Sequence, residues 1–179
     1  MAITIVATVG SASANSFVTE VEQIAYMATR LNASSWTSVT GSTCTETEKA
    51  AMVEATRELS ALRWLGLRTD STQVLSWPRQ WVPNADPVNL AYDYYSSSAI
   101  PQRVKDATME LAFQFMKSGT TDVAALDPNM GVIEKTVDVL TTRWQPYQKP
   151  TGLSRFPSVM RFIQPLLEST SFQTTLVRG

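Results

Sequence analysis

The chain has 179 residues, a formal net charge of -1, no histidine and one cysteine. The near-neutral charge excludes a strongly basic nucleic-acid-binding protein that relies on bulk attraction to phosphates. The lack of histidine excludes mechanisms that need an imidazole, and the single Cys44 excludes an internal disulfide and a Cys-rich zinc site. Hydrophobic residues make up 44% of the chain, which is enough for one substantial core.

The sequence gives no sign of a membrane protein. No stretch approaches the roughly 20 apolar residues of a membrane-spanning helix. The N-terminal residues MAITIVATVG lack the positive region of a signal peptide. We therefore expect a protein that is made in the cytoplasm and has no membrane partner.

Two helix starts are predicted by a threonine followed three positions later by a glutamate. The pairs are Thr19 with Glu22 and Thr45 with Glu48, and both have the spacing of a capping box. A metal site or an acid–base pair is the alternative reading of these carboxylates. Capping is the stronger interpretation, because carboxylates stabilise helix N-termini.

Hydrophobic periodicity predicts helices over 20–31 and 46–65, with Gly66 as the stop signal of the second. A third helix is predicted to begin at Pro101 and to end before Gly119. The buried stripe expected on this third helix consists of Val104, Ala107, Thr108, Leu111 and Phe115.

The segment 67–98 is predicted to be a long irregular loop, rich in proline and aromatic residues. Arginine and tryptophan alternate around its start and could stack on unpaired bases. The same residues could instead pack the loop onto the preceding helix, and this is the interpretation we favour. The residues concerned are Arg63, Trp64, Arg68, Trp77, Arg79 and Trp81.

The segment 133–144 alternates with a period of two and predicts a strand or strand pair. A short last helix is expected to be interrupted at Pro165. The predicted fold class is mainly α: a small bundle of about four helices, a long irregular loop, a minor β-strand region and extended terminal arms. The predicted division is an arm over 1–18, a helical domain over 19–168 and a tail over 169–179.

Several segments together resemble a known family. They include Trp77-Pro78-Arg79 and the helix start Ile100-Pro101 followed by Val104-Lys105. Across 14–119 the chain resembles a tailed-phage group labelled DnaT-like single-stranded DNA-binding proteins, and its helix layout is similar to that of phage head–tail connector (adaptor) proteins. It departs from the usual pattern at Gln80-Trp81, where a small turn residue is expected.

The resemblance implies a virion protein of the phage neck. Such a subunit forms a ring, most often dodecameric, beneath the portal protein, extends the DNA channel and bridges to tail or stopper proteins. Double-stranded DNA passes through without sequence-specific binding, and no catalytic residue, cofactor or metal is implied. The tail would dock on the portal through Phe172, Leu176, Val177 and Arg178.

From the residues themselves, the tail is either a frayed end or a peptide that orders on a partner. The candidate subunit-interface residues are Val137, Val139, Trp77, Trp81 and Tyr94. The alternative function is that of a single-stranded DNA-binding accessory protein, which would depend on Trp77 and Arg79. A small enzyme is a remote third possibility.

Overall fold

The computed structural model describes residues 2–88, 93–118, 134–137, 140–143 and 152–168. Most regular structure within these ranges is helical, and the predicted mainly α class is confirmed. The α-helices are α1 (Glu20–Thr29), α2 (Glu46–Ser60), α3 (Gln102–Ser118) and α4 (Pro157–Ile163). Short 3-10 turns flank α4, namely η2 (Gly152–Arg155) and η3 (Gln164–Leu166).

The strands are short and antiparallel. In one pair, β1 (Leu67–Arg68) lies against β2 (Arg79–Gln80). In the other, β3 (Glu134–Val137) lies against β4 (Leu140–Arg143), which confirms a strand pair within the predicted region 133–144. No helix in the described ranges is long and apolar enough to span a membrane.

Both predicted capping boxes are present. At α1, the hydroxyl of Thr19 accepts a hydrogen bond from the backbone N–H of Glu22 at 3.2 Å, and the Glu22 carboxylate accepts one from the Thr19 N–H at 2.8 Å. At α2, Thr45 and Glu48 form the same reciprocal bonds at 3.3 and 2.8 Å. Each cap stabilises its helix by about 1 kcal/mol, so the helix starts follow directly from local sequence.

The second helix ends earlier than the periodicity predicts. α2 stops at Ser60, and Trp64 then turns back into the core, where its indole N–H donates to the Leu59 carbonyl at 2.8 Å. The burial of a large aromatic side chain here outweighs continuation of the helix. Gly66 is therefore not the stop signal of this helix, which corrects the prediction.

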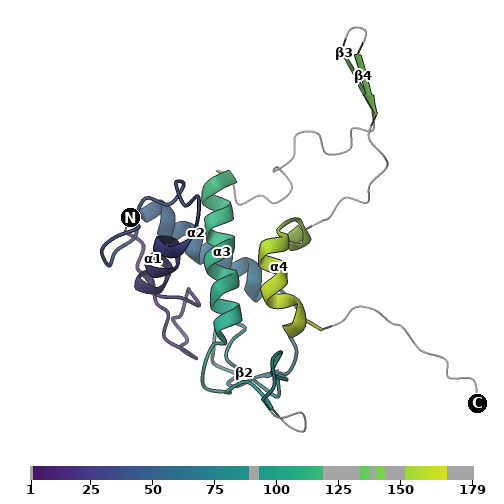
Figure 1. The fold of residues 1–179 in the computed structure, drawn as a ribbon. Helices are drawn as coiled ribbons and strands as arrows, with labels where there is room; N and C mark the ends of the chain where they lie inside the picture. Colours follow the sequence, from purple (N-terminus) through teal and green to yellow (C-terminus); the bar gives the residue numbers. More distant parts are fainter. Residues whose placement is uncertain (1, 89–92, 119–133, 138–139, 144–151, 169–179) are drawn as a thin grey trace, which may run out of the picture.

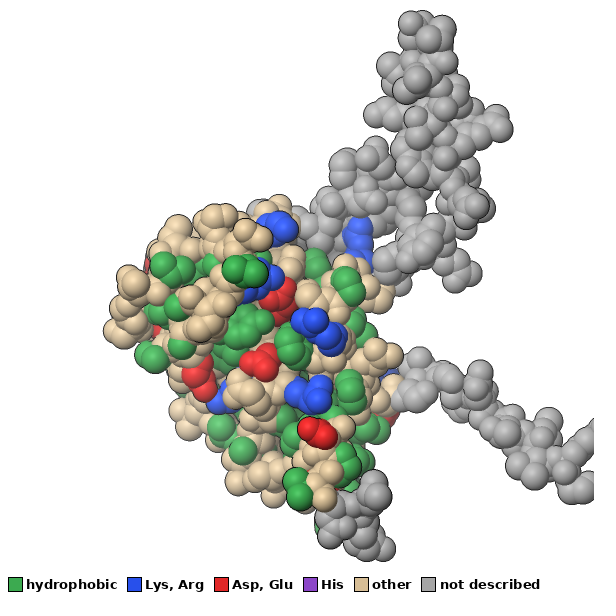
Figure 2. Space-filling model, viewed as in Figure 1, with side chains coloured by type: hydrophobic (Ala, Val, Ile, Leu, Met, Phe, Trp, Pro, Cys, Tyr) green, Lys and Arg blue, Asp and Glu red, His purple; other side chains and the backbone are tan. Residues whose placement is uncertain are grey.

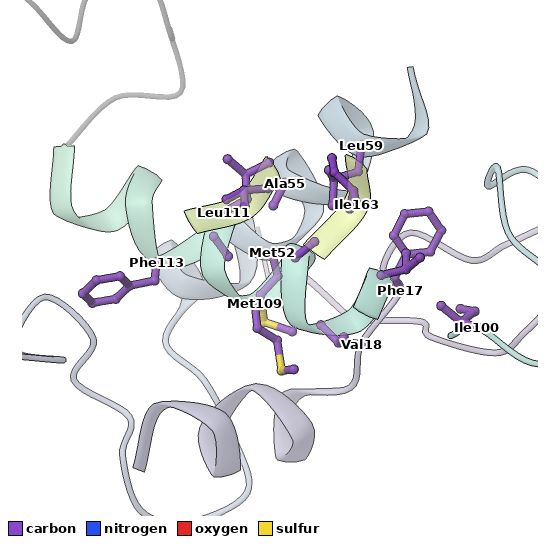
Figure 3. Packing of buried hydrophobic residues seen from close by; sticks show 14 of the residues in the cluster. Phe17, Val18, Met52, Ala55, Leu59, Ile100, Met109, Leu111, Phe113 and Ile163 are labelled. Atoms are coloured by element: carbon purple, nitrogen blue, oxygen red, sulfur yellow. The ribbon is translucent and has the colours of Figure 1, made fainter. Parts of the chain in front are cut away.

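The central element is α3, which contacts α1, α2 and α4 (Figure 1). Its predicted stripe is buried throughout, and Met109 and Phe113 on other sides of the helix are also buried, because neighbouring elements cover α3 on more than one side. The close view shows side chains of α2 meeting those of α3 and α4 (Figure 3). This core includes Met52, Ala55, Leu59, Leu111 and Ile163.

A buried polar contact holds α1 against α3. The guanidinium of Arg30 donates two hydrogen bonds to the Glu110 carboxylate, at 2.8 and 2.7 Å, and lies 3.9 Å from the centre of the Phe113 ring. The Glu110 side chain is only 4% exposed. A carboxylate at this depth is stable in its charged form only when a cation pairs with it through hydrogen bonds.

The N-terminal residues form an ordered segment without strands in the described part. The Asn15 side chain accepts from the Val6 N–H at 2.8 Å and donates to the Thr4 carbonyl at 2.8 Å. Phe17 and Val18 are buried in the core. The end of the predicted arm is thus continuous with the helical body.

The last described residues are tied to the segment that follows α2. α4 ends at Ile163, before Pro165, so the predicted interruption is confirmed. Beyond it, the Leu65 N–H donates to the Leu166 carbonyl at 2.9 Å, and the Glu168 N–H donates to the Arg63 carbonyl at 3.0 Å. Glu168, the last described residue, is therefore fixed beside the start of the long loop.

Candidate functional site

The two tryptophans at the start of the long loop are structural. Trp64 is 2% exposed and Trp77 is 1% exposed, and their rings meet edge to face with centroids 5.5 Å apart. Such a pair adds about 0.5–1.5 kcal/mol beyond the burial of its area. The packing interpretation of these two residues is confirmed, and neither ring is accessible to a nucleic-acid base.

Arg79 is held by the backbone around it. Its guanidinium donates to the carbonyls of Leu65 at 2.8 Å, Gly66 at 2.6 Å, Trp64 at 3.2 Å and Ser76 at 3.3 Å. Burial lowers the pKa of Arg79, and these carbonyl contacts fix the side chain in place. The base-stacking role considered for Arg79 is therefore incompatible with its position in this fold.

Gly66 allows the backbone before β1 to lie close to the end of β2. Its φ is +72°, and a Cβ placed on it would lie 2.3 Å from the Gln80 carbonyl oxygen. Any larger residue would push β1 away from β2. The glycine that the sequence suggested as a helix stop is thus required because two backbone segments approach each other closely at this position.

Trp81 and Tyr94 form an exposed aromatic pair. Trp81 is 64% exposed and Tyr94 is 44% exposed, with ring centroids 5.9 Å apart at 88°. The φ of Trp81 is +64°, in the left-handed region that glycine enters most readily. This is the position where a small turn residue was expected, and the loop keeps that turn with a tryptophan in it.

The other predicted interface and docking residues are only partly described. Val137 lies opposite Leu140 in the register of β3 and β4. Val139 and the tail residues Phe172, Leu176, Val177 and Arg178 lie outside the described residues. Trp77 points into its own subunit, so we no longer count it among the interface candidates.

The carboxylate of Glu48 has a role that the sequence showed only in part. Besides capping α2, it accepts hydrogen bonds from the backbone N–H groups of Thr37 at 2.7 Å and Ser38 at 3.0 Å and from both hydroxyls. Burial alone would raise the pKa of Glu48, but these bonds lower it to about 2. The capping spacing identified the residue, but no local pattern indicated the loop contact.

Cys44 lies beside this carboxylate and is buried. Burial, followed by the nearby Glu48 and Glu20 carboxylates, raises the pKa of its thiol to about 12. A thiol that stays protonated is a poor nucleophile. Within the described residues, no group of three or more His, Cys, Asp or Glu side chains is arranged to hold a metal ion.

The comparisons with known proteins give one match. A family model described as "Putative DnaT-like ssDNA binding protein" matches residues 1–179. No curated protein matches the chain, and no solved structure does. The match spans the whole sequence and agrees with the resemblance carried by the Trp77-Pro78-Arg79 segment. The chain belongs to the DnaT-like ssDNA-binding protein family.

Proposed function

We propose that this protein is a structural subunit of the phage neck. It forms a ring beneath the portal protein, extends the DNA channel and bridges to tail or stopper proteins. The role is suggested by the resemblance to head–tail connector proteins described in the sequence analysis, which no match to a solved structure tests. A ring repeats one contact between two different surfaces, so each subunit must present exposed residues that a neighbour can cover.

The observation that carries the proposal is the conformation of Trp81. A non-glycine residue in the left-handed region costs about 1–2 kcal/mol, and Trp81 at φ +64° leaves most of its ring in solvent. The isolated subunit gains little from this arrangement. A neighbouring chain that covers the Trp81–Tyr94 pair would gain the burial of two aromatic rings.

The charge distribution also favours a channel protein. On the face in Figure 2, Lys and Arg side chains lie among Asp and Glu side chains and uncharged surface, and the described residues visible there form no continuous basic band. A strongly basic lining would bind DNA tightly and impede its movement. A mixed surface lets the duplex slide.

Replacing Trp81 with glycine separates assembly from folding. Glycine adopts φ +64° without strain, so Trp81→Gly should leave the free energy of unfolding of the isolated subunit unchanged or raise it by about 1 kcal/mol. Ring formation, measured by sedimentation velocity and electron microscopy, should be lost. The control is Leu31→Ala at another exposed hydrophobic position. Rings formed equally well by Trp81→Gly would rule out this surface as the subunit contact.

A truncation after Glu168 tests the portal-docking role of the tail. The α-helical fold should survive, because the truncation keeps every described residue, including Glu168 and its hydrogen bond to Arg63, and affinity for the portal should fall. In phage particles, the protein should form a symmetric annulus at the neck. Unchanged portal affinity would exclude the docking tail, and absence from mature particles would exclude the neck role.

Single-stranded DNA binding is the second candidate, because the family description names it and the exposed Trp81–Tyr94 pair offers faces for base stacking. It predicts that an oligonucleotide binds with a steep salt dependence and that Trp81→Ala weakens binding. Fluorescence anisotropy measures both. Lack of binding at low salt would exclude this function.

A further inference from the structure

A small polar pocket lies where the end of α2 meets the turn before β2. Its volume is about 330 Å³, at the small end of the range of about 300–1,000 Å³ typical of ligand pockets. The pocket uses neither Trp81 nor Tyr94. Its polar lining consists of Ser60, Arg63, Arg68, Ser76, Arg79 and Glu168.

Two hydroxyl groups of this lining lack partners. The side-chain oxygens of Ser60 and Ser76 are buried and form no hydrogen bond with any described residue, and Ser76 as a whole is only 9% exposed. A buried polar group without a hydrogen bond costs about 1–3 kcal/mol. A polar occupant of the pocket would satisfy both groups once the serine side chains rotate their hydroxyls toward it.

The charges in the pocket favour an anion. Three guanidinium groups share the lining with the single carboxylate of Glu168. Arg63 and Arg68 are exposed, and neither forms an ion pair with a carboxylate within the described ranges. Burial lowers the pKa of Arg79, Glu168 raises it and Arg68 lowers it, so the three charges lie close enough to influence one another. The net excess of positive charge is unneutralised.

The hydrogen-bond donors of the pocket differ in whether other groups already occupy them. Arg79 is occupied by four backbone carbonyls and serves as a fixed positive wall. Arg63 and Arg68 remain available as forked donors, which match the geometry of oxyanions. A phosphate group has more acceptor oxygens than a carboxylate, so it can accept from more of the guanidinium and hydroxyl donors in this lining at once.

We infer that this pocket binds a phosphate group, either free or carried by a nucleotide or nucleic-acid end. The guanidinium groups of Arg63 and Arg68 bind its oxygens, and the hydroxyls of Ser60 and Ser76 donate to it. Glu168 opposes the anion and sets the affinity. The inference concerns a binding site only and holds for either proposed function.

The test is a calorimetric titration of the full chain at low ionic strength with inorganic phosphate, a 5′-mononucleotide and a short 5′-phosphorylated oligonucleotide. Arg68→Gln should weaken binding about tenfold or more, through loss of a charge-assisted contact. Glu168→Gln should strengthen it several-fold. The matched control is Arg57→Gln on the exposed side of α2, 71% exposed, which should bind like the wild type.

Ser76→Ala distinguishes a ligand contact from a structural one. If Ser76 serves a ligand, the variant should bind phosphate more weakly while the free energy of unfolding of the free protein stays equal or rises. Preference for the mononucleotide or oligonucleotide over phosphate would identify a nucleotide or nucleic-acid source, and equal affinity would identify free phosphate. Absence of binding by all three probes, or equal loss in Arg57→Gln and Arg68→Gln, would overturn the inference.

Discussion

Replacing Glu48 with glutamine tests the most connected buried carboxylate among the described residues. Glu48 is 0% exposed and accepts hydrogen bonds from Thr37, Ser38 and Thr45. Glutamine keeps the size of the side chain, but it removes the charge and turns an NH2 group toward groups that already donate. The change therefore removes one electrostatic anchor without opening a cavity.

The magnitude follows from the pKa of Glu48, which falls from its usual 4.5 to about 2 in the folded protein. At about 1.4 kcal/mol per pKa unit this corresponds to about 3 kcal/mol. The glutamine oxygen can still accept part of the hydrogen bonds, so the expected loss is about 2–3 kcal/mol. Because the folded pKa is lowered, this stability is fully present above about pH 4.5. It is lost as the pH falls from about 4.5 to about 2.

The assay is urea unfolding of the wild type and of Glu48→Gln at a series of pH values from neutral to strongly acidic. The difference in free energy of unfolding should be about 2–3 kcal/mol at neutral pH and should shrink steadily below about pH 4.5. Glu54→Gln on the same helix is the control; its exposed ion pair with Arg57 is worth well under about 1 kcal/mol. A difference that does not change with pH would refute the reasoning.

Three further predictions concern the core. Arg30→Met leaves the buried Glu110 carboxylate without its cation and should lower the free energy of unfolding by about 3–5 kcal/mol; adding Glu110→Leu should recover much of this in the same urea assay. Trp77→Ala removes a ring that is 1% exposed and should cost about 3–5 kcal/mol, with loss of near-ultraviolet circular dichroism. Cys44, whose pKa is raised from 9.0 to about 12, should react with a thiol reagent at mildly alkaline pH about 1,000-fold more slowly in the folded protein than in urea, in proportion to its thiolate fraction; equal rates would show that the thiol is accessible.

Local signals in the sequence predicted the helix starts well. The caps at Thr19 and Thr45 need only residues three positions apart, and the stripe on α3 needs only helical spacing. The end of α2 was harder, because it depends on Trp64 finding Trp77 across the loop. Helix ends decided by tertiary contacts leave no local pattern.

In the candidate sites, too, some features follow from local sequence and others depend on tertiary contacts. The sequence identified Trp81 and Tyr94 as surface candidates, and both are exposed. It also singled out Arg63 and Arg68, but it gave no reason to place Ser76 beside them. That contact depends on the reversal of the chain between β1 and β2, which is held by Arg79 and by the close approach at Gly66. Contacts between residues far apart in the chain cannot be predicted from the spacing of residues along the sequence.

The link between Leu167 and Trp64 has a consequence for evolution. Since α3 and α4 pack against each other, the stretch 119–151 begins and ends at anchored points of one body. We therefore expect insertions and deletions among homologues in this stretch, because a change in its length need not move α3 relative to α4.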